Sequence, residues 1–496
     1  MFSIPTAQHR RWSTHSRQQL RQRHARRRQD QLRRRHARKA RAARRQLGQL
    51  HEALPQPAHS VLDGLTDGFS RPSFLRFVVL ALATILTLGK RTVCNLLRTL
   101  GVLAPGHPSS YHRFFSHRRW SCWRLARSLT GWVLDHLVPD GPVILAGDDT
   151  VDEHRGVKVF GKGCHRDPVR STRTFTAYRW GHKWVVLAVL VRWPFCRRRW
   201  ALPLLVALYR SPADNRRAGR PHKTPVRLLQ QLCCVLLRWF GSRRFLLTAD
   251  GAYATHELAC FAARQQGRLT LVSPFYADAN VYEPPPPYTG RGRPRVKGAK
   301  RPTPQEVVAR TPRTRLNVAW YGGGRRDVEV VSDVAHWYKG GQGLVAVRWV
   351  YVQDVTGTHR DSYFLTTDPT LSVADIIATY TGRWNLETTF QEMRSCLGLE
   401  TTRGWKAQTV LRMAPCLFGL YTLVASLYSQ LPRRYAGLRA VLWPGKQDVT
   451  FGDALTAVRR WLWREWIFGI PRYRQGFAKL TRSFRSLLLH GLAPAM

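Results

Sequence analysis

Two short apolar stretches, each followed by aspartate, decide how this chain folds. Residues 143–150 read VILAGDDT, and residues 245–251 read FLLTADG. Short, continuous apolar runs that end in turn residues are typical of strands buried on both faces. Further apolar runs and helical patterns alternate around them, at residues 184–191, 226–240, 257–264 and 269–272. Strands that alternate with helices predict an α/β fold in which helices cover both faces of a sheet.

The aspartates after these runs are candidates for chemistry. Asp148 and Asp149 follow the first run, and Asp250 follows the second. Ligands and catalytic groups of α/β sheets collect at the carboxyl ends of strands, and carboxylate oxygens there suit Mg²⁺ or Mn²⁺. Neighbouring strand residues point to opposite faces, so we expect only one of Asp148 and Asp149 to face such a site. Aspartate is also common at the start of loops, which is the purely structural alternative.

A third carboxylate lies on a long helix that is predicted to start at Ser372 with a capping box completed by Asp375, to run to about Arg394 and to end near Gly398. Residues 380–394 read YTGRWNLETTFQEMR. At about 100° per residue, Tyr380, Arg383, Glu387 and Arg394 share one helical face within about 60°. The carboxylate suits a metal ion, and the guanidinium groups suit phosphate oxygens. A solvated ion pair between Arg383 and Glu387 would explain the spacing without any function.

Together these features resemble the DDE pattern of RNase H-like transposases. The helical stretch is similar to the Tyr-x2-Arg-x3-Glu-x6-Lys signature of a large branch of bacterial insertion-sequence transposases, with Arg394 in place of the lysine. The segment TADGAY at 248–253 resembles the family's sequence around its second aspartate. In that family the first aspartate stands directly before Thr or Ser, which favours Asp149 over Asp148. The resemblance spans about residues 141–430.

The resemblance implies a function and a set of site residues. Asp149, Asp250 and Glu387 would be catalytic and would bind Mg²⁺ or Mn²⁺ as a pair of ions. Tyr380, Arg383 and Arg394 would bind DNA phosphates near the cut.

The implied reaction is metal-dependent cleavage of the element's DNA ends, followed by transfer of the freed 3′-hydroxyl into target DNA. In this branch the flank can be released through a hairpin. The family also implies a homodimer that bridges two ends in the synaptic complex, and a cytoplasmic, nucleoid-associated protein of bacteria.

The charge of the chain indicates a polyanionic partner. There are 80 Lys and Arg residues against 30 Asp and Glu, a net charge of +50. Nucleic acid is the common polyanion, so DNA is the expected partner. Residues 1–50 hold 16 of the Lys and Arg residues and one acid, Asp30. We expect residues 1–60 to be a basic arm that is disordered alone and becomes helical on DNA; a solvated tail is the alternative.

The remaining pattern predicts a fold class and its boundaries. We expect an α/β, RNase H-like catalytic core interrupted by a β-rich insertion, preceded by a helical region and the basic arm. The predicted segments after the arm are a helical, DNA-end-binding region at 61–140, the first part of the core at 141–273, the insertion with a basic loop at 274–370, the glutamate-bearing part at 371–430, and a basic C-terminal region at 431–496. Residues 61–140 fit a helix-turn-helix or a plain helical subdomain.

Two further segments are candidates for DNA contact. Arg291 and Arg295 flank a Gly-Arg-Pro that contains Arg293, and this stretch resembles an AT-hook core, which lies in the minor groove. A flexible basic loop fits the sequence equally. The tryptophans at 461–466 fit a buried core better than a surface that stacks on bases.

Other functions and classes explain less of the sequence. A non-catalytic DNA-binding protein derived from a transposase, and an RNase H-like nuclease that cuts without joining, are the two alternatives. The Gly-Asp-Asp turn also resembles that of RNA-dependent polymerases, which does not explain the helix around Glu387.

The nine cysteines lack metal-ligand spacing, and the most apolar run, residues 77–88, is shorter than the roughly 20 residues that span a membrane.

Overall fold

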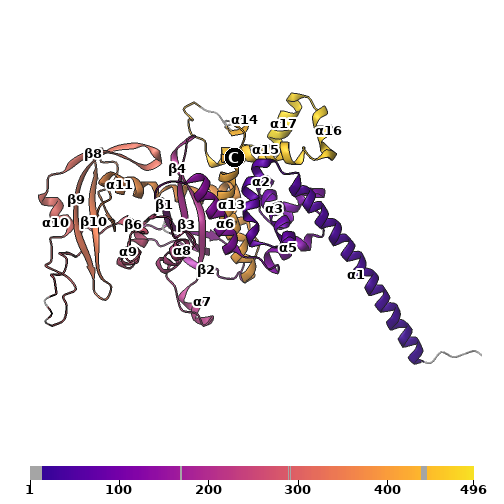
Figure 1. Cartoon of the computed structure of the whole chain (residues 1–496), viewed down its shortest axis with the longest axis horizontal. Coiled ribbons are helices and arrows are strands. Elements are labelled where there is room, and N and C mark those ends of the chain that lie inside the picture. The colour runs from indigo at the N-terminus through magenta and orange to yellow at the C-terminus, as the bar shows by residue number, and fades with distance from the viewer. Residues whose placement is uncertain (1–13, 168–169, 289, 291, 437–443, 496) are drawn as a thin grey trace, which may run out of the picture.

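The chain folds around one mixed sheet of eleven strands (Figure 1). This computed structural model describes residues 14–167, 170–288, 290, 292–436 and 444–495. The strand order is β2-β3-β1-β5-β6-β11-β10-β9-β7, with β4 paired to β3 and β8 paired to β9. The strands are β1 (Val143–Glu153), β2 (Gly163–Arg166), β3 (Tyr178–Trp193), β4 (Cys196–Tyr209), β5 (Phe245–Ala249), β6 (Leu269–Pro274), β7 (Val281–Tyr282), β8 (Thr314–Ala319), β9 (Arg325–Lys339), β10 (Gly343–Asp354) and β11 (Ser362–Thr366).

The parallel part of the sheet is small and central. β5 pairs in parallel with β1 and with β6, whereas the other strand pairs are antiparallel. All five residues of β5 are buried, as expected for an apolar run covered on both faces. The covering helices are α8 (Pro225–Trp239) against β3 and β4, α9 (His256–Ala263) against β6, and α12 (Asn385–Leu397) and α13 (Ala407–Ser429) against β4. The predicted combination of helices with a large sheet is confirmed as a mixed α/β fold.

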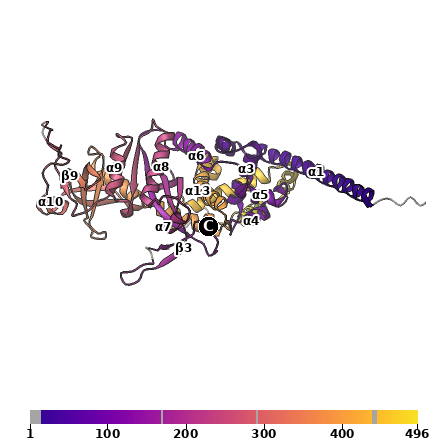
Figure 2. The ribbon, with the colours of Figure 1, turned by 90° about the horizontal axis from the view of Figure 1, so that it is seen from below.

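Residues 274–370 are β-rich, and their strands continue the same sheet. β11 joins the sheet through β6, with Thr366 opposite Val272. β10 and β9 then extend it outward, so this segment lies at one end of an elongated molecule (Figures 1 and 2). Without β11, the backbone of β6 would present an unpaired edge. The short helix α10 (Pro304–Arg310) precedes β8.

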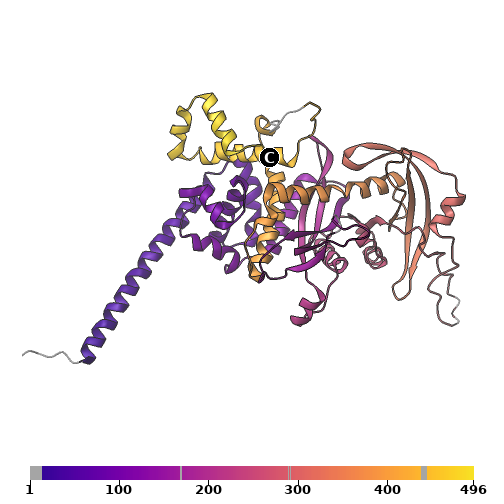
Figure 3. The same ribbon diagram turned by 180° about the vertical axis from the view of Figure 1, so that it is seen from behind.

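The N-terminal residues form a helix, which the sequence predicted only for the DNA-bound arm. α1 (Thr14–Glu52) projects away from the body as a single long helix (Figures 1 and 3). Arginine, glutamine and alanine dominate it, and these residues favour helix even without tertiary contacts. Its last turns are anchored, because Leu47 and Leu50 are buried and the indole of Trp466 donates to the Leu50 carbonyl at 2.9 Å.

Helices also build the rest of the region that lies opposite the β-rich end. The N-terminal ones are α2 (Gln56–Leu62), α3 (Arg71–Leu86), α4 (Val93–Leu100), α5 (Pro108–Ser116) and α6 (Cys122–Leu137), and the C-terminal ones are α14 (Arg433–Ala436), α15 (Phe451–Trp461), α16 (Pro471–Lys479) and α17 (Arg482–Leu492). Trp461 and Trp466 are buried among them, which places both in the core, and Trp463 is half-buried. α1 contacts α3, so the projecting helix and the body share one core.

The stretch predicted as one long helix is divided in two. α11 (Val373–Gly382) begins at Ser372, whose hydroxyl accepts from the Asp375 amide at 3.1 Å, and α12 ends at Gly398, which has a φ of 64°. Both ends match the sequence pattern of caps. The break falls after Gly382, since glycine weakens a helix. Arg383 and Trp384 nevertheless keep right-handed helical angles, so the face predicted for residues 383–394 is preserved.

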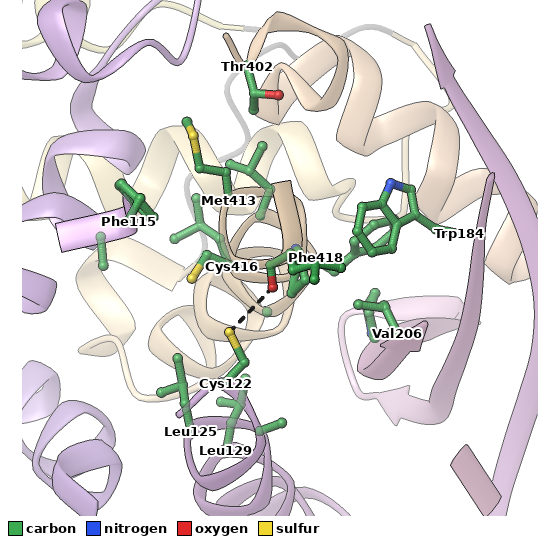
Figure 4. Close-up of a pocket in the computed structure, with 18 of the residues that line it drawn as sticks. Phe115, Cys122, Leu125, Leu129, Trp184, Val206, Thr402, Met413, Cys416 and Phe418 are labelled. Carbon is green, nitrogen blue, oxygen red and sulfur yellow. Dashed lines mark hydrogen bonds between the residues drawn. The ribbon is translucent and has the colours of Figure 1, made fainter. Parts of the chain in front are cut away.

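α13 is the one described helix whose length and apolar composition would allow it to cross a membrane. It lies inside the fold, packed against β4, α6 and α15, as a core helix does. A cavity of about 430 Å³ lies beside it, lined mainly by apolar side chains such as Leu129, Val206 and Phe418 (Figure 4). In Figure 4 the thiol of Cys122 points from α6 toward α13 and donates to the Leu411 carbonyl at 3.7 Å.

Candidate catalytic site

Strand pairing brings the first two predicted acidic positions together. β1 and β5 pair in parallel up to Gly147 and Ala249, so Asp148 and Asp250 each come directly after the last shared pair. β1 itself does not end there, because β3 pairs with it as far as Glu153. The aspartates after the first apolar run therefore lie within a strand, and the sequence prediction that they follow its end is corrected by the long partner β3.

The two faces of β1 are covered by different helices. A Cβ on Gly147 would lie 2.7 Å from Leu229, so this residue faces α8. Asp148 points the other way, where Arg383 precedes α12. Thr150 shares the face of Asp148 and accepts a hydrogen bond from Arg394 of α12. Asp148 is therefore the acid of β1 that contacts Arg383, which in turn contacts Glu387 of α12.

Arg383 joins the carboxylates of this face. Its Nη1 donates to Asp148 Oδ2 at 2.8 Å, and its Nη2 donates to Glu387 Oε1 at 2.9 Å. Arg383 and Asp148 are both buried, whereas 47% of the Glu387 side chain is exposed. One guanidinium thus neutralises a buried and a half-exposed carboxylate, which is the task that a bound cation would perform.

Burial and like charges make this group of acids unfavourable without a cation. Burial raises the pKa of Asp148 to about 8 against the opposing effect of Arg383, and Asp250 and Asp149 raise it further. Burial likewise raises the pKa of Asp250, again against Arg383. Nearby cations favour charged carboxylates, so a metal ion here would relieve the cost of keeping both ionised.

Asp149 lies on the other face with partners of its own. Its Oδ2 accepts from the hydroxyl of Tyr253 at 3.0 Å, and its Oδ1 lies 3.0 Å from Nζ of Lys183. Asp149 therefore already has a cation and a hydrogen-bond donor. The sequence favours Asp149 because Thr150 follows it, but the contacts with Arg383 and the position of α12 favour Asp148.

The residues predicted to bind phosphate are held by protein groups. The ring of Tyr380 packs on Phe364, with 4.3 Å between the ring centroids. The guanidinium of Arg383 lies 5.8 Å from the centroid of the Tyr380 ring. Arg394 donates to Thr150, and its Nε lies 3.4 Å from Glu400 Oε1. The structure thus places Tyr380 and Arg383 beside the carboxylates and Arg394 further along the same face.

Two residues near the acids, Tyr321 and Lys183, were not expected from the sequence. Tyr321 lies in the turn between β8 and β9, where burial raises its pKa and the charges of Arg383 and Glu387 are close enough to affect it. No motif surrounds Tyr321 except three following glycines, and Lys183 is only the last polar residue before a strand pattern. Only the assembled sheet could bring either one to the acids.

The basic loop between β7 and α10 is separate in sequence from the acids described above. Arg293 and Arg295 are exposed between β7 and α10, and Arg291 lies outside the described residues. Lys297 of the same loop sits over the rings of Tyr282 and Tyr338, at 3.9 and 4.2 Å. The structure therefore shows Arg293 and Arg295 as accessible side chains.

The donor set fits a hard divalent cation. Asp148, Asp250 and Glu387 offer carboxylate oxygens, the ligands that Mg²⁺ and Mn²⁺ prefer. The guanidinium of Arg383 shows that a cation is accommodated between Asp148 and Glu387. Metal binding would require Arg383 to release these oxygens, and its guanidinium would then be available to an incoming anion.

A match to a family of known proteins agrees with this chemistry. Residues 64–327 match a family described as DDE superfamily endonuclease, a match that includes Asp148, Asp149 and Asp250 and ends before Glu387. A solved piggyBac transposase synaptic complex with hairpin DNA is similar at 11% identity, over 86% of this chain and 77% of that one, with a TM-score of 0.35. No curated protein matches the chain. Since the family match covers more than half of its residues, the chain belongs to the DDE superfamily endonucleases.

Proposed function

We propose that this chain is the DDE transposase of a bacterial insertion sequence. It would cleave the element's DNA ends with Mg²⁺ or Mn²⁺ and transfer the freed 3′-hydroxyl into target DNA. The observation that supports this most is the convergence of carboxylates from β1, from the end of β5 and from α12 around the guanidinium of Arg383. Membership of the DDE superfamily endonucleases supports the cleavage half of the reaction.

The proposed metal ligands are Asp148, Asp250 and Glu387. Asp149, which the sequence favours as the first acid, is the alternative to Asp148. A pair of divalent ions bound there would activate the attacking water or 3′-hydroxyl and stabilise the leaving oxygen of the phosphodiester. Asp148 would supply its charge from a buried position and Asp250 from a half-buried one, and Glu387 would supply the exposed charge that meets the DNA.

The arginines and the tyrosine would hold the DNA backbone. Arg383 is buried beside the acids, and a planar guanidinium can bind phosphate oxygens in pairs once it releases Asp148. Tyr380 stays packed on Phe364 and keeps this guanidinium in place. Arg394 is proposed as a further phosphate contact, although its present partners Thr150 and Glu400 make it equally a support of the site.

The charge distribution supports DNA as the partner. The net charge of the chain is +50, and the described arginines of α1 are exposed along a helix that projects from the body. Such a helix can follow a DNA groove or backbone beyond the reach of the body. We propose that Arg291, Arg293 and Arg295 add a minor-groove contact, that two copies bridge the element's ends, and that the protein works on the bacterial nucleoid.

The test is a cleavage and joining assay on a plasmid that carries the DNA flanking this gene, in Mg²⁺ or Mn²⁺. A transposase cuts at both flanking ends and gives joined product. A nuclease cuts without joining, and a transposase-derived binder shifts the DNA without any cut. Glu387→Gln is the matched control: it should bind the same ends with nearly unchanged affinity and produce no cut.

A further inference from the structure

A second cluster of ionisable side chains lies on the same face of β1 as Asp148. It consists of Asp152, His154 and His182, with His182 facing Asp152 from β3. All three are buried, with exposed fractions of 0%, 8% and 2%. Asp152 is four residues beyond Asp148, about 13 Å along a strand that rises about 3.3 Å per residue. The cluster is therefore separate from the proposed catalytic site.

The protonation of His182 follows from its neighbours. Its Nε2 lies 2.9 Å from the carbonyl oxygen of Phe160, so Nε2 carries the proton and donates it. In a neutral ring of this kind, Nδ1 holds only a lone pair. That Nδ1 has no hydrogen-bond partner among the described residues, and it lies 3.5 Å from Asp152 Oδ1. The same Oδ1 accepts a hydrogen bond from the backbone amide of His182 at 3.1 Å. A lone pair directed at a carboxylate oxygen is repulsive, so a proton on Nδ1 or a metal ion between the two atoms would stabilise the arrangement.

His154 completes a set of donors with the spacing of metal ligands. Its Nε2 lies 3.2 Å from Asp152 Oδ2, and its ring centroid is 4.5 Å from that of His182. A tetrahedral ion with ligand bonds of about 2.0–2.1 Å separates neighbouring donors by about 3.3–3.4 Å. The separations of 3.2 Å to Oδ2 and 3.5 Å to Oδ1 are close to that value, and they involve the two different oxygens of Asp152. One donor atom from each residue lies within 4.8 Å of the others.

We propose that Asp152, His154 and His182 bind one zinc ion, with water as the fourth ligand. Two imidazoles and one carboxylate suit Zn²⁺, whereas Mg²⁺ prefers a full set of oxygens. Histidines that bind metal usually donate their other ring N–H to a carbonyl or carboxylate, as His182 does to Phe160. The ion would tie β1 to β3 and hold the segment around Phe160 against them, so its role is to stabilise the strand that carries Asp148.

Metal content of the purified full-length chain tests the proposal. After zinc loading and exhaustive dialysis, mass spectrometry should find one zinc per chain. His154→Ala and His182→Ala should each lower that content at least tenfold. The matched control is His51→Ala, which alters the separate group of His51, His59 and Asp63, and it should keep the zinc, as should Asp148→Asn.

A spectroscopic measurement on the wild-type chain tests the proposal even if the variants do not fold. Replacing zinc by Co²⁺ in the wild-type chain should give the visible absorption of a tetrahedral site, and chelation should abolish it and lower the melting temperature. Less than one tenth of a zinc per chain with no cobalt spectrum would overturn the proposal and leave a histidinium–aspartate pair. Equal loss of zinc in His51→Ala would overturn it as well.

Discussion

Asp148 and Asp152 occupy the same face of the same strand, yet they have different neighbours. Asp148 lies against Arg383 and near Asp250, whereas Asp152 lies between two imidazoles. Both carboxylates are buried and both need a positive charge. The first has partners that can release it to a hard cation and to DNA, and the second has nitrogen donors that suit a tightly held ion. The helices and strands around each aspartate, rather than the aspartate itself, therefore determine which ions and groups it can bind.

The largest expected effect separates Asp148 from Asp149. Asp148→Asn should lower the rate of DNA-end cleavage by about 10³-fold or more, because metal ligation supplies several kcal/mol of transition-state stabilisation. Asp149→Asn should be milder, since its carboxylate contacts Tyr253 and Lys183 on the other face. Single-turnover cleavage of an end-bearing DNA measures both. The reverse order would restore Asp149 as the metal ligand.

Replacing Arg383 tests whether its two ion pairs matter to chemistry. Arg383→Ala should lower the cleavage rate by about 10²-fold, the usual cost of losing a charged donor near the reacting phosphate. It also leaves Asp148 buried without its partner, which should destabilise the metal-free chain by about 3–5 kcal/mol. Saturating Mg²⁺ should recover part of that stability but little of the rate. Full recovery of both would mean that Arg383 only takes the place of the ion.

The pH dependence of stability distinguishes the buried acids in the absence of metal. The pKa of Asp148 is raised to about 8 in the fold, mainly by burial, from about 4 in the unfolded chain. The folded state therefore binds this proton more tightly, and stability is lost as the pH rises from about 4 toward 8. The melting temperature of metal-free wild type should fall over this range, and that of Asp148→Asn should fall less. If the melting temperatures of the two proteins fall equally with pH, ionisation of Asp148 does not lower the stability of the fold.

The smallest effect concerns the projecting helix. Removing residues 1–40 should flatten the salt dependence of DNA binding, by about 0.9 in the log–log slope for each DNA phosphate that the helix neutralises. The deletion spares the buried Ala43, Leu47 and Leu50, so the body should melt as before. Binding measured between 50 and 200 mM salt gives the slope. An unchanged slope would exclude α1 as a DNA-binding element.

Much of the fold and the components of the site were predictable locally. Apolar runs predicted the buried strands β1 and β5, and Ser372 and Gly398 marked the start of α11 and the end of α12. For α1 the sequence predicted helix only on DNA, because its charge suggested disorder in the free arm; arginine and alanine favour helix, and its last turns are anchored in the core.

Local patterns could not predict which face of the sheet a strand residue occupies or which side chains it contacts. Whether Asp148 or Asp149 faces α12 depends on the register of β1, since one residue of shift exchanges the two faces. The pairing of His182 with Asp152 depends on the register between β1 and β3, two strands separated by more than twenty residues of chain.

The positions of the buried strands and of several helix ends follow from the amino-acid sequence, because they depend on local patterns of apolar and polar side chains. Membership of the DDE superfamily endonucleases, too, rests on sequence. Only the tertiary structure decided that Arg383 reaches both Asp148 and Glu387, and that two histidines close around Asp152. These are contacts between distant segments, and their geometry is set by strand register and helix packing, which no local pattern encodes.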